Sequence, residues 1–443
     1  MKISFHGGAQ EVTGACHLLE TKDVKILLDC GLFQGGRTIQ EHNYENFGFN
    51  PAEIDFLCVS HAHLDHIGRI PKLVKEGFKG IIYSTAPTRD LARPLLDDAL
   101  ELAGREDREI YTREDMEKAF SLWQTAPYEE TLDAKGIKLR FRNAGHILGS
   151  AMVEIWADNR HLLFTGDLGN IPSTLLPPPE VVAGIDILII ESAYGGRTRD
   201  IIEDKSLKLE RAVEDVATRR GALLIPAFAA ERTQDILHML NEMVLFKRTP
   251  EMPVYVDSPL AIKITKVFEK YPSCYRQEIK DLFLKHPNLF RFKKLIFSET
   301  TEDSKKINDI TPPKVIIAGA GMMTGGRILH HARRYLGDPN SILLMVGYQG
   351  SGTLGRKLME GEKVVKIMGE EVMVRAEIRL AEGFSAHADN RQLTAFVETN
   401  RDTLQKIFVV QGEKGESEGF AQQVKDRMGI SATAPQMHEE FII

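Results

Sequence analysis

The chain has 443 residues, of which 43% are hydrophobic and 27% charged, and its formal net charge is −7 at pH 7. This length exceeds that of most single domains, so we expect two units or one heavily inserted unit. The negative net charge argues against a protein that coats polyanions over its whole surface, although a local basic channel is compatible with it. The four cysteines form no CxxC pair and no apolar run approaches the length of a membrane span. This predicts buried thiols and a cytoplasmic protein without membrane association.

Short apolar runs that end in Gly or Asp dominate the first 190 residues and predict β-strands. In chain order they lie at 24–31, 54–60, 80–85, 137–146, 161–167 and 185–191. Helical patterns interleave with them at 67–77, 89–106 and 113–124. Strands that come first, with helices between them, predict a layered domain of sheets and helices.

The sequence HAHLDH at 61–66 follows the apolar run FLCVS and predicts a metal site at the end of a strand. In a helix, positions 61 and 63 would point in different directions, so the side chains can converge only on a folded loop. There His61 and His63 would aim at one point, while Asp65 and His66 aim at a second. Imidazole and carboxylate groups together suit zinc. The alternative is a loop of solvated histidines. Three histidines within six residues are improbable by chance, because the whole chain has only 14 histidines.

Further candidate ligands stand where other predicted strands end. His146 follows the strand at 137–143, and Asp167 follows the strand at 161–165. Because ligands at the carboxyl ends of neighbouring strands meet at one edge of a sheet, we expect these two residues to join the first cluster. An aspartate there can bridge two cations, which can activate a hydroxide and clamp a phosphate. Asp29 also ends a strand, and it is either an acceptor that orients a ligand histidine or a turn residue before Gly31.

The pattern of apolar and polar residues changes near residue 200, where longer helix, strand and helix patterns cover 204–245. Further strands are predicted in 252–259, 314–321 and 341–348, so this segment reads as a parallel-sheet module with helical crossovers. Within it, Gly325 and Gly326 could bring backbone N–H groups to a phosphate that Arg327 would pair with. The alternative is a strand-to-helix turn that needs glycine for its geometry. Ser385 and the backbone of Ala386 are further candidates for phosphate or RNA binding.

Taken together, these motifs resemble the metallo-β-lactamase fold. This resemblance rests on HAHLDH, on the GH dipeptide that ends at His146, on the GD dipeptide that ends at Asp167, and on Asp29 at the end of its strand. ESAYG at 191–195 is similar to the acidic motif A of the β-CASP group, and SAH at 385–387 is similar to its motif B. The segments 318–334 and 346–358 resemble parts of its inserted domain. The similarity is to bacterial and archaeal endoribonucleases related to the cleavage and polyadenylation specificity factor nuclease.

The resemblance implies an α/β fold, with a metallo-β-lactamase αββα sandwich and an inserted parallel-sheet β-CASP domain. We expect the first domain at 1–199 and 380–443, the β-CASP domain at 200–379, and the active site in a cleft between them. It also implies a zinc-dependent endoribonuclease that hydrolyses phosphodiester bonds of single-stranded RNA in RNA processing or decay. Such an enzyme would hold two Zn²⁺ per chain and could form a homodimer. Hydrolysis of a small ester, thioester or lactam is an alternative, and DNA is a weaker alternative substrate.

The same resemblance assigns roles to the acid–base residues. His387, held by the carboxylate of Glu191, would protonate the departing ribose oxygen. Asp65 would belong to the catalytic metal cluster. Without the family, His387 could be an ordinary loop histidine and Glu191 a capping or ion-pair carboxylate.

One position departs from the family pattern. The motif C histidine of a VHGE-like segment is replaced by Gln411 in FVVQGE. A neutral amide oxygen is a poorer zinc ligand than imidazole. One metal site could therefore be weakened, opened to water or tuned to Mn²⁺, or the chain could be a catalytically weak RNA-binding member of the family.

Overall fold

The computed structural model describes residues 1–198, 205–350, 352–381 and 383–443. The chain folds into two compact units, one formed by Met1–Arg199 with Ala386–Ile443 and the other by Asp200–Ser385. The boundary predicted at 199–200 lies outside the described residues. The predicted return at 380 needs correction, because β19 (Glu377–Leu380) pairs in parallel with β16 (Ile342–Met345) of the second unit. The strand pairing with that sheet continues to Leu380, and the last residue of the second unit is Ser385.

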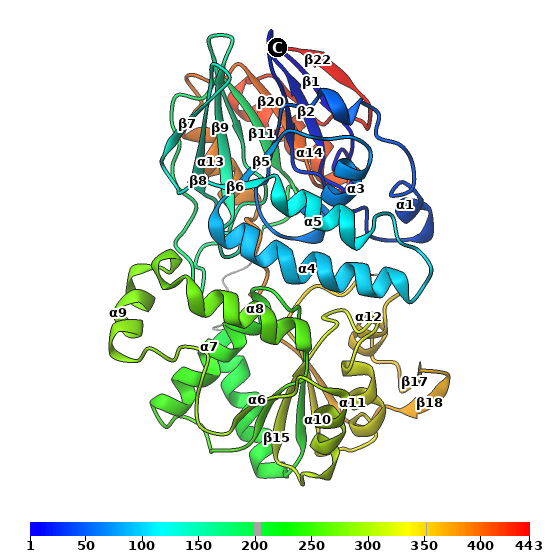
Figure 1. Cartoon of the computed structure of the whole chain (residues 1–443). Helices are drawn as coiled ribbons and strands as arrows, with labels where there is room; N and C mark the ends of the chain where they lie inside the picture. The colour runs from blue at the N-terminus through cyan, green and yellow to red at the C-terminus, as the bar shows by residue number, and fades with distance from the viewer. Residues whose placement is uncertain (199–204, 351, 382) are drawn as a thin grey trace. The chain divides into compact units, whose positions relative to one another are not determined.

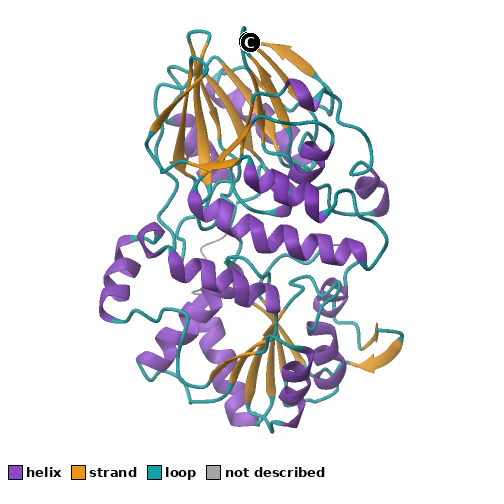
Figure 2. Ribbon diagram, in the orientation of Figure 1, coloured by secondary structure: helices purple, strands orange, loops and turns teal. Residues whose placement is uncertain are grey.

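The first unit contains two seven-stranded sheets, drawn in orange in Figure 2. One has the order β22 (Glu440–Ile442), β1 (Lys2–Phe5), β2 (His17–Glu20), β3 (Lys25–Leu28), β4 (Phe56–Cys58), β5 (Ile81–Ser84) and β6 (Trp123–Thr125). The other has the order β21 (Ala432–Thr433), β20 (Lys406–Val410), β11 (Ile187–Glu191), β10 (Arg160–Phe164), β9 (Ala151–Ala157), β8 (Ile137–Asn143) and β7 (Thr131–Ala134).

The core of the first unit lies between these two sheets. Alternate residues of each strand point into it, as the twofold repeat of a strand requires, including Ile26 and Leu28 of β3 and Leu162 and Phe164 of β10. The intervening Leu163 packs on the opposite face, against α13 (Asn390–Glu398) and α14 (Lys414–Met428). The remaining helices are α1 (Arg37–Glu41), α2 (Leu64–Ile67), α3 (Ile70–Lys75), α4 (Ala86–Gly104) and α5 (Arg113–Ser121). This arrangement confirms the predicted sandwich of sheets and helices.

The second unit is built on a six-stranded sheet in which all paired strands run parallel, which confirms the predicted module. Its order is β14 (Leu295–Phe297), β13 (Val254–Val256), β15 (Lys314–Ala318), β12 (Ala222–Pro226), β16 and β19. A separate hairpin joins β17 (Val364–Ile367) and β18 (Glu370–Met373). Its helices are α6 (Lys205–Arg219), α7 (Arg232–Leu245), α8 (Pro259–Lys270), α9 (Gln277–Lys285), α10 (Thr301–Lys306), α11 (Ile328–Tyr335) and α12 (Leu354–Met359). The buried sequence ALLIP of β12 illustrates why a strand covered on both faces reads as a continuous apolar run.

Two local predictions were wrong. The helix predicted for 113–124 ends at Ser121, because Trp123 begins the edge strand β6 beside β5. The metal motif was expected to be entirely a loop, but helix α2 already begins at Leu64 and contains Asp65 and His66. His63 is the extended N-cap residue of this single turn. A short helix of four residues is too brief for a periodic signal in the sequence.

Candidate metal centre

Strand ends from both sheets of the first unit supply the candidate ligands. His61 follows β4 of the first sheet, whereas His146 and Asp167 follow β8 and β10 of the second. We had expected convergence at one edge of a single sheet. The two sheets pack face to face, so strand ends from opposite layers meet over the shared core.

Four ligand atoms form a compact group, provided by His61, His63, His146 and Asp167 and lying within 4.8 Å of one another. His63 Nδ1 is 3.0 Å from His61 Nε2 and 3.2 Å from His146 Nε2. Asp167 Oδ2 is 3.5 Å from His61 Nε2 and 3.4 Å from His146 Nε2. A tetrahedral zinc ion bonded at about 2.0–2.1 Å holds its ligand atoms about 3.3 Å apart. The donor set therefore fits one zinc ion in both chemistry and spacing.

The opposite ring nitrogens of these ligands have partners that orient the rings. His61 Nδ1 is 3.0 Å from the hydroxyl of Ser60, and His146 Nδ1 is 3.4 Å from the carbonyl of Ala386. Such contacts select the tautomer that presents the other nitrogen to a metal. Ser60 was not predicted, although its place directly before His61 was a usable signal.

A second set of candidate ligands comprises Asp65, His66, Asp167 and Gln411. Asp29 accepts hydrogen bonds from Ser60 N at 2.7 Å and Ser60 Oγ at 2.6 Å, and its Oδ2 is 2.6 Å from His66 Nδ1. Asp29 is fully buried, as expected of a residue that orients a ligand histidine. His66 Nε2 is 3.3 Å from Asp167 Oδ1 and 3.9 Å from Asp65 Oδ2. Within the described residues, this set is not among the donor groups that gather within 4.8 Å.

Gln411 reaches this second set through its amide nitrogen. Nε2 donates to Asp167 Oδ1 at 2.8 Å and lies 3.0 Å from His66 Nε2. The amide oxygen Oε1 is buried and has no hydrogen-bond partner in the described part of the chain. The side chain thus turns its amide nitrogen, rather than its oxygen, toward both neighbours.

Glu191 and His387 lie beside Asp167, and the three provide a further group of possible donors. The carboxylate of Glu191, at the end of β11, accepts hydrogen bonds from Leu168 N at 2.6 Å and Ala193 N at 3.2 Å. Both its oxygens are 3.3 Å from His387 Nδ1. His387 Nδ1 is also 3.8 Å from Asp167 Oδ2. Glu191 is therefore fixed by the backbone and can position the imidazole of His387.

Burial and charge act in opposite directions on these groups. Burial alone would lower the pKa of His387, but the carboxylates of Glu191 and Asp167 outweigh it and raise the pKa to about 9. Burial likewise disfavours charge on His66, yet Asp167, Asp29 and Asp65 hold its pKa well above the usual range. Burial lowers the pKa values of His61 and His146, which favours the neutral rings that metal ligation needs.

The predicted phosphate-binding residues of the second unit have other partners. Arg327 Nη1 is 2.7 Å from Asp257 Oδ1 and 2.9 Å from the carbonyl of Ser298. Asp257 is fully buried and also accepts from His331 and Ser304. This network holds Arg327 against its own unit and was not predicted, because Asp257 and Arg327 are 70 positions apart.

The two glycines before Arg327 differ in what they require. Gly326 has φ +76°, and a Cβ there would lie 2.3 Å from the carbonyl oxygen of Gly319. Gly325 has open space for a Cβ. Turn geometry thus accounts for Gly326. Ser385 ends the second unit, whereas the carbonyl of Ala386, in the first unit, accepts from Asn170 N at 2.8 Å.

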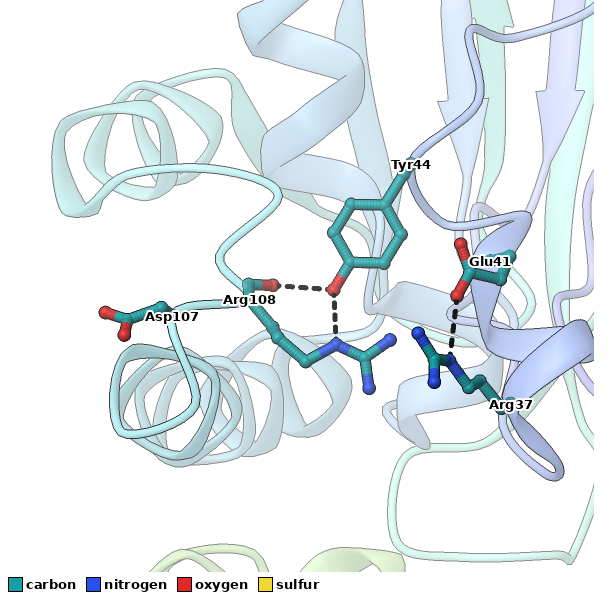
Figure 3. A pocket seen from close by; sticks show the side chains of 5 residues that line it. All are labelled: Arg37, Glu41, Tyr44, Asp107 and Arg108. Atoms are coloured by element: carbon teal, nitrogen blue, oxygen red, sulfur yellow. Dashed lines mark hydrogen bonds and ion pairs between the residues drawn. The ribbon is translucent and has the colours of Figure 1, made fainter.

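A surface hollow of the first unit lies elsewhere, and none of the predicted site residues lines it (Figure 3). Two of its arginine side chains have hydrogen-bond partners within the hollow. Arg37 Nε donates to Glu41 Oε1 at 3.5 Å, and Arg108 Nε donates to the hydroxyl of Tyr44 at 3.1 Å. We assign no role to this hollow.

Comparisons with known proteins cover nearly the whole chain. Residues 10–227 match the metallo-beta-lactamase superfamily, residues 233–358 the Beta-Casp domain, and residues 371–435 the Zn-dependent metallo-hydrolase RNA specificity domain. The described residues include no helix long and apolar enough to cross a membrane.

Several named proteins are similar to this chain in sequence. A protein named as a ribonuclease from Thermus thermophilus is 37% identical over 94% of each chain. The transcription termination factor FttA from Methanosarcina mazei is 33% identical over 98% of this chain and 70% of its own length. An RNase J-like protein from Methanocaldococcus jannaschii is 33% identical over 98% of this chain and 97% of its own. The crystal structure of a protein of unknown function from Enterococcus faecalis V583 matches with a TM-score of 0.57 at 12% identity, over 100% of this chain and 99% of that chain, which concerns the fold alone.

Proposed function

The chain belongs to the β-CASP ribonucleases of the metallo-β-lactamase superfamily, and from that premise we propose that it is a zinc-dependent endoribonuclease that cuts single-stranded RNA in RNA processing or decay. The observation that carries this proposal is the compact group of His61, His63, His146 and Asp167 with the Glu191–His387 pair beside it. A metal ion held there would supply a Lewis acid that activates water near neutral pH.

The residues around this group would perform the proton transfer and the positioning. Glu191 fixes the imidazole of His387, and the nearby carboxylates favour the protonated ring at neutral pH. His387 can therefore hold the proton that the departing ribose oxygen requires. Asp65, with its side chain 19% exposed at the edge of the second ligand set, is proposed to act in the same centre.

The experiment is cleavage of an internally labelled RNA oligonucleotide by the intact chain, after removal of metal by chelation and readdition of Zn²⁺ or Mn²⁺. We expect internal cuts in single-stranded RNA, slower cutting of a matched duplex or DNA, and no cutting without metal. His63→Ala should lose this activity, whereas His330→Ala, a substitution at an exposed histidine of α11, should retain it.

Two other outcomes would point to different functions. RNA binding without cleavage at saturating Zn²⁺ and Mn²⁺ would identify a catalytically weak RNA-binding member of the family. Hydrolysis of a chromogenic lactam or thioester without RNA cleavage would identify a small-molecule hydrolase. A cytoplasmic location and a homodimer stay predictions, which cell fractionation and light scattering would check.

A further inference from the structure

Two exposed aromatic side chains lie at the carboxyl edge of the parallel sheet in the second unit. Phe228 follows β12 and is 45% exposed, and Tyr348 follows β16 and is 53% exposed. We propose that these two rings stack on unpaired nucleobases of the RNA strand and so form a binding surface for the substrate. The proposal rests on the proposed function, because it takes RNA as the ligand, and it adds a base-binding surface within the second unit.

The sheet topology places both rings where parallel sheets bind their ligands. β12 and β16 are neighbours in the sheet. From β12 the chain passes through α7 to β13 on one side, whereas from β16 it passes through α12 and the β17–β18 hairpin to β19 on the other. The loops that follow these two strands therefore leave in opposite directions. This makes the edge between them the switch point of the sheet, and open parallel sheets bind ligands outside the carboxyl ends of their strands at such a point.

The register of the two strands brings the rings onto adjacent loops. Leu223 of β12 pairs with Ile342 of β16, and continuing this parallel register for five positions sets Phe228 beside Gly347. The contact agrees with the register, because a Cβ at Gly347 would lie 3.9 Å from Cε2 of Phe228. Tyr348 is the next residue, so the two aromatic side chains start from neighbouring points of the backbone.

Glycine allows the Phe228 ring to lie close to the backbone of the adjoining loop. A Cβ at Gly321, which follows β15, would lie 2.9 Å from Cδ2 and 3.0 Å from Cε2 of this ring. A side chain at position 321 would therefore displace the ring. The ring rests against backbone and still exposes nearly half of its side chain, which leaves room for a flat ligand.

Hydrogen bonds fix the loops that carry the rings. The carbonyl of Phe228 accepts from Thr233 N at 3.3 Å and from Thr233 Oγ1 at 2.7 Å. Gln349 is 2% exposed, and its Nε2 donates to the carbonyls of Gly321 at 3.0 Å and Gly347 at 3.1 Å. Gln349 thus joins the loop after β15 to the loop after β16. A surface that is ordered before binding loses little conformational entropy when a base stacks on it.

The chemistry of this surface suits single-stranded RNA. Each base has a flat π-face, and stacking on aromatic rings tolerates any sequence but requires bases that are free of a duplex. A cation for the RNA backbone lies nearby, because Glu360 and, more weakly, Tyr348 raise the pKa of the exposed Arg356 guanidinium of α12. The Arg356–Glu360 ion pair is exposed, and such a pair is weak enough to exchange for a phosphate.

The test is binding of a short labelled single-stranded RNA to the full chain, followed by fluorescence anisotropy with metal chelated so that no cutting occurs. We expect Phe228→Ala and Tyr348→Ala each to raise Kd about 5- to 100-fold, since stacking of one base supplies a factor of that order. Tyr348→Phe keeps the ring and should bind like the wild type. Phe246→Ala is the matched control, because Phe246 is 59% exposed and follows α7, the helix that returns to the amino ends of the strands.

A scan with abasic nucleotides distinguishes stacking from a structural effect of the substitutions. Replacing one base at a time should weaken binding to the wild type at the stacked positions. The same abasic RNAs should lose little further affinity for the Phe228→Ala, Tyr348→Ala double variant, because the base and the ring contribute to one contact. Circular dichroism checks that each variant is folded. The salt dependence of Kd should stay the same in these variants, since no phosphate contact is removed.

Several outcomes would overturn the inference. Wild-type affinity in both folded alanine variants would do so, as would equal abasic losses in the wild type and the double variant. Binding of adenosine monophosphate without ring-dependent binding of RNA would indicate a mononucleotide site instead. Self-association that is lost in the variants while RNA binding is unchanged would assign the surface to a contact between copies of the chain.

Cleavage of the same RNA, measured after Zn²⁺ is restored, separates this inference from the proposed function. Ring-dependent binding without cleavage would support the inference and count against the ribonuclease proposal. Cleavage with binding that does not depend on the rings would support the ribonuclease proposal and overturn the inference.

Discussion

Gly31 allows the backbone of the metal motif to approach β3 closely, and Gly31→Ala should displace that motif. A Cβ at Gly31 would lie 1.5 Å from the carbonyl oxygen of Asp65 and 2.6 Å from the nitrogen of His66. Ordinary van der Waals contact begins at 3.4 Å, so the α2 turn would have to retreat by about 2 Å. The obstacle is backbone, which cannot rotate away as a flexible side chain could.

The size of this shift sets the expected losses. Functional sites need their groups held within about 0.5 Å, and a displacement of about 1 Å can cost about 100-fold in rate. We therefore expect RNA cleavage by Gly31→Ala to fall at least about 100-fold. Overpacking in a buried region costs about 1–3 kcal/mol, so the free energy of unfolding should fall by that amount or more.

The assay combines zinc content, cleavage rate and urea denaturation of the variant and a control. Gly419→Ala is the control, because a Cβ at this position of α14 meets no atom within 4 Å. It should keep activity and gain up to about 1 kcal/mol of stability, since alanine is the better helix former. A Gly31→Ala protein with wild-type zinc content, rate and stability would refute the steric reasoning.

Three further predictions concern the same unit. His146→Ala removes one of four ligand atoms, so equilibrium dialysis should show zinc affinity reduced by more than about 100-fold, and unchanged affinity would contradict the proposed ligand set. Glu191→Gln removes the charge that positions His387, so single-turnover cleavage should fall about 100- to 10,000-fold at unchanged zinc content; equal loss of zinc would indicate a structural role instead. His17 is fully buried, and burial lowers its pKa to about 3. The unfolded chain therefore takes up the proton first, and stability falls by about 2 kcal/mol between pH 7 and pH 5. His17→Leu should lose this part of the pH dependence in urea denaturation, and an identical dependence in both proteins would show that His17 does not cause it.

The sequence contained enough to predict the fold class and the family. Short apolar runs indicated the strands: they alternate with polar residues in β8, as in a half-buried strand, and are continuous in β12 and β15, as in a parallel sheet. These signals are readable because the periodicity of a strand depends on residues close together in the chain. The helix end at Ser121 and the one-turn helix α2 were missed because tertiary pairing and a single hydrogen-bonded turn leave no such periodicity.

For the site, the sequence by itself determined which residue types were available and that they follow strand ends. The compact cluster at 61–66 contains most of the candidate ligands. The replacement of the motif C histidine by Gln411 can also be seen directly in the sequence. Their roles as ligands and catalysts stay predictions, although the positions are now known.

Only the tertiary structure decided which atoms face one another. It placed the amide nitrogen of Gln411, rather than its oxygen, against His66, a residue 345 positions away. It also gave Arg327 the buried carboxylate of Asp257 as its partner. The physical reason is that a hydrogen bond depends on tenths of an ångström and on the orientation of donor and acceptor, and both are set by the packing of segments distant in the chain.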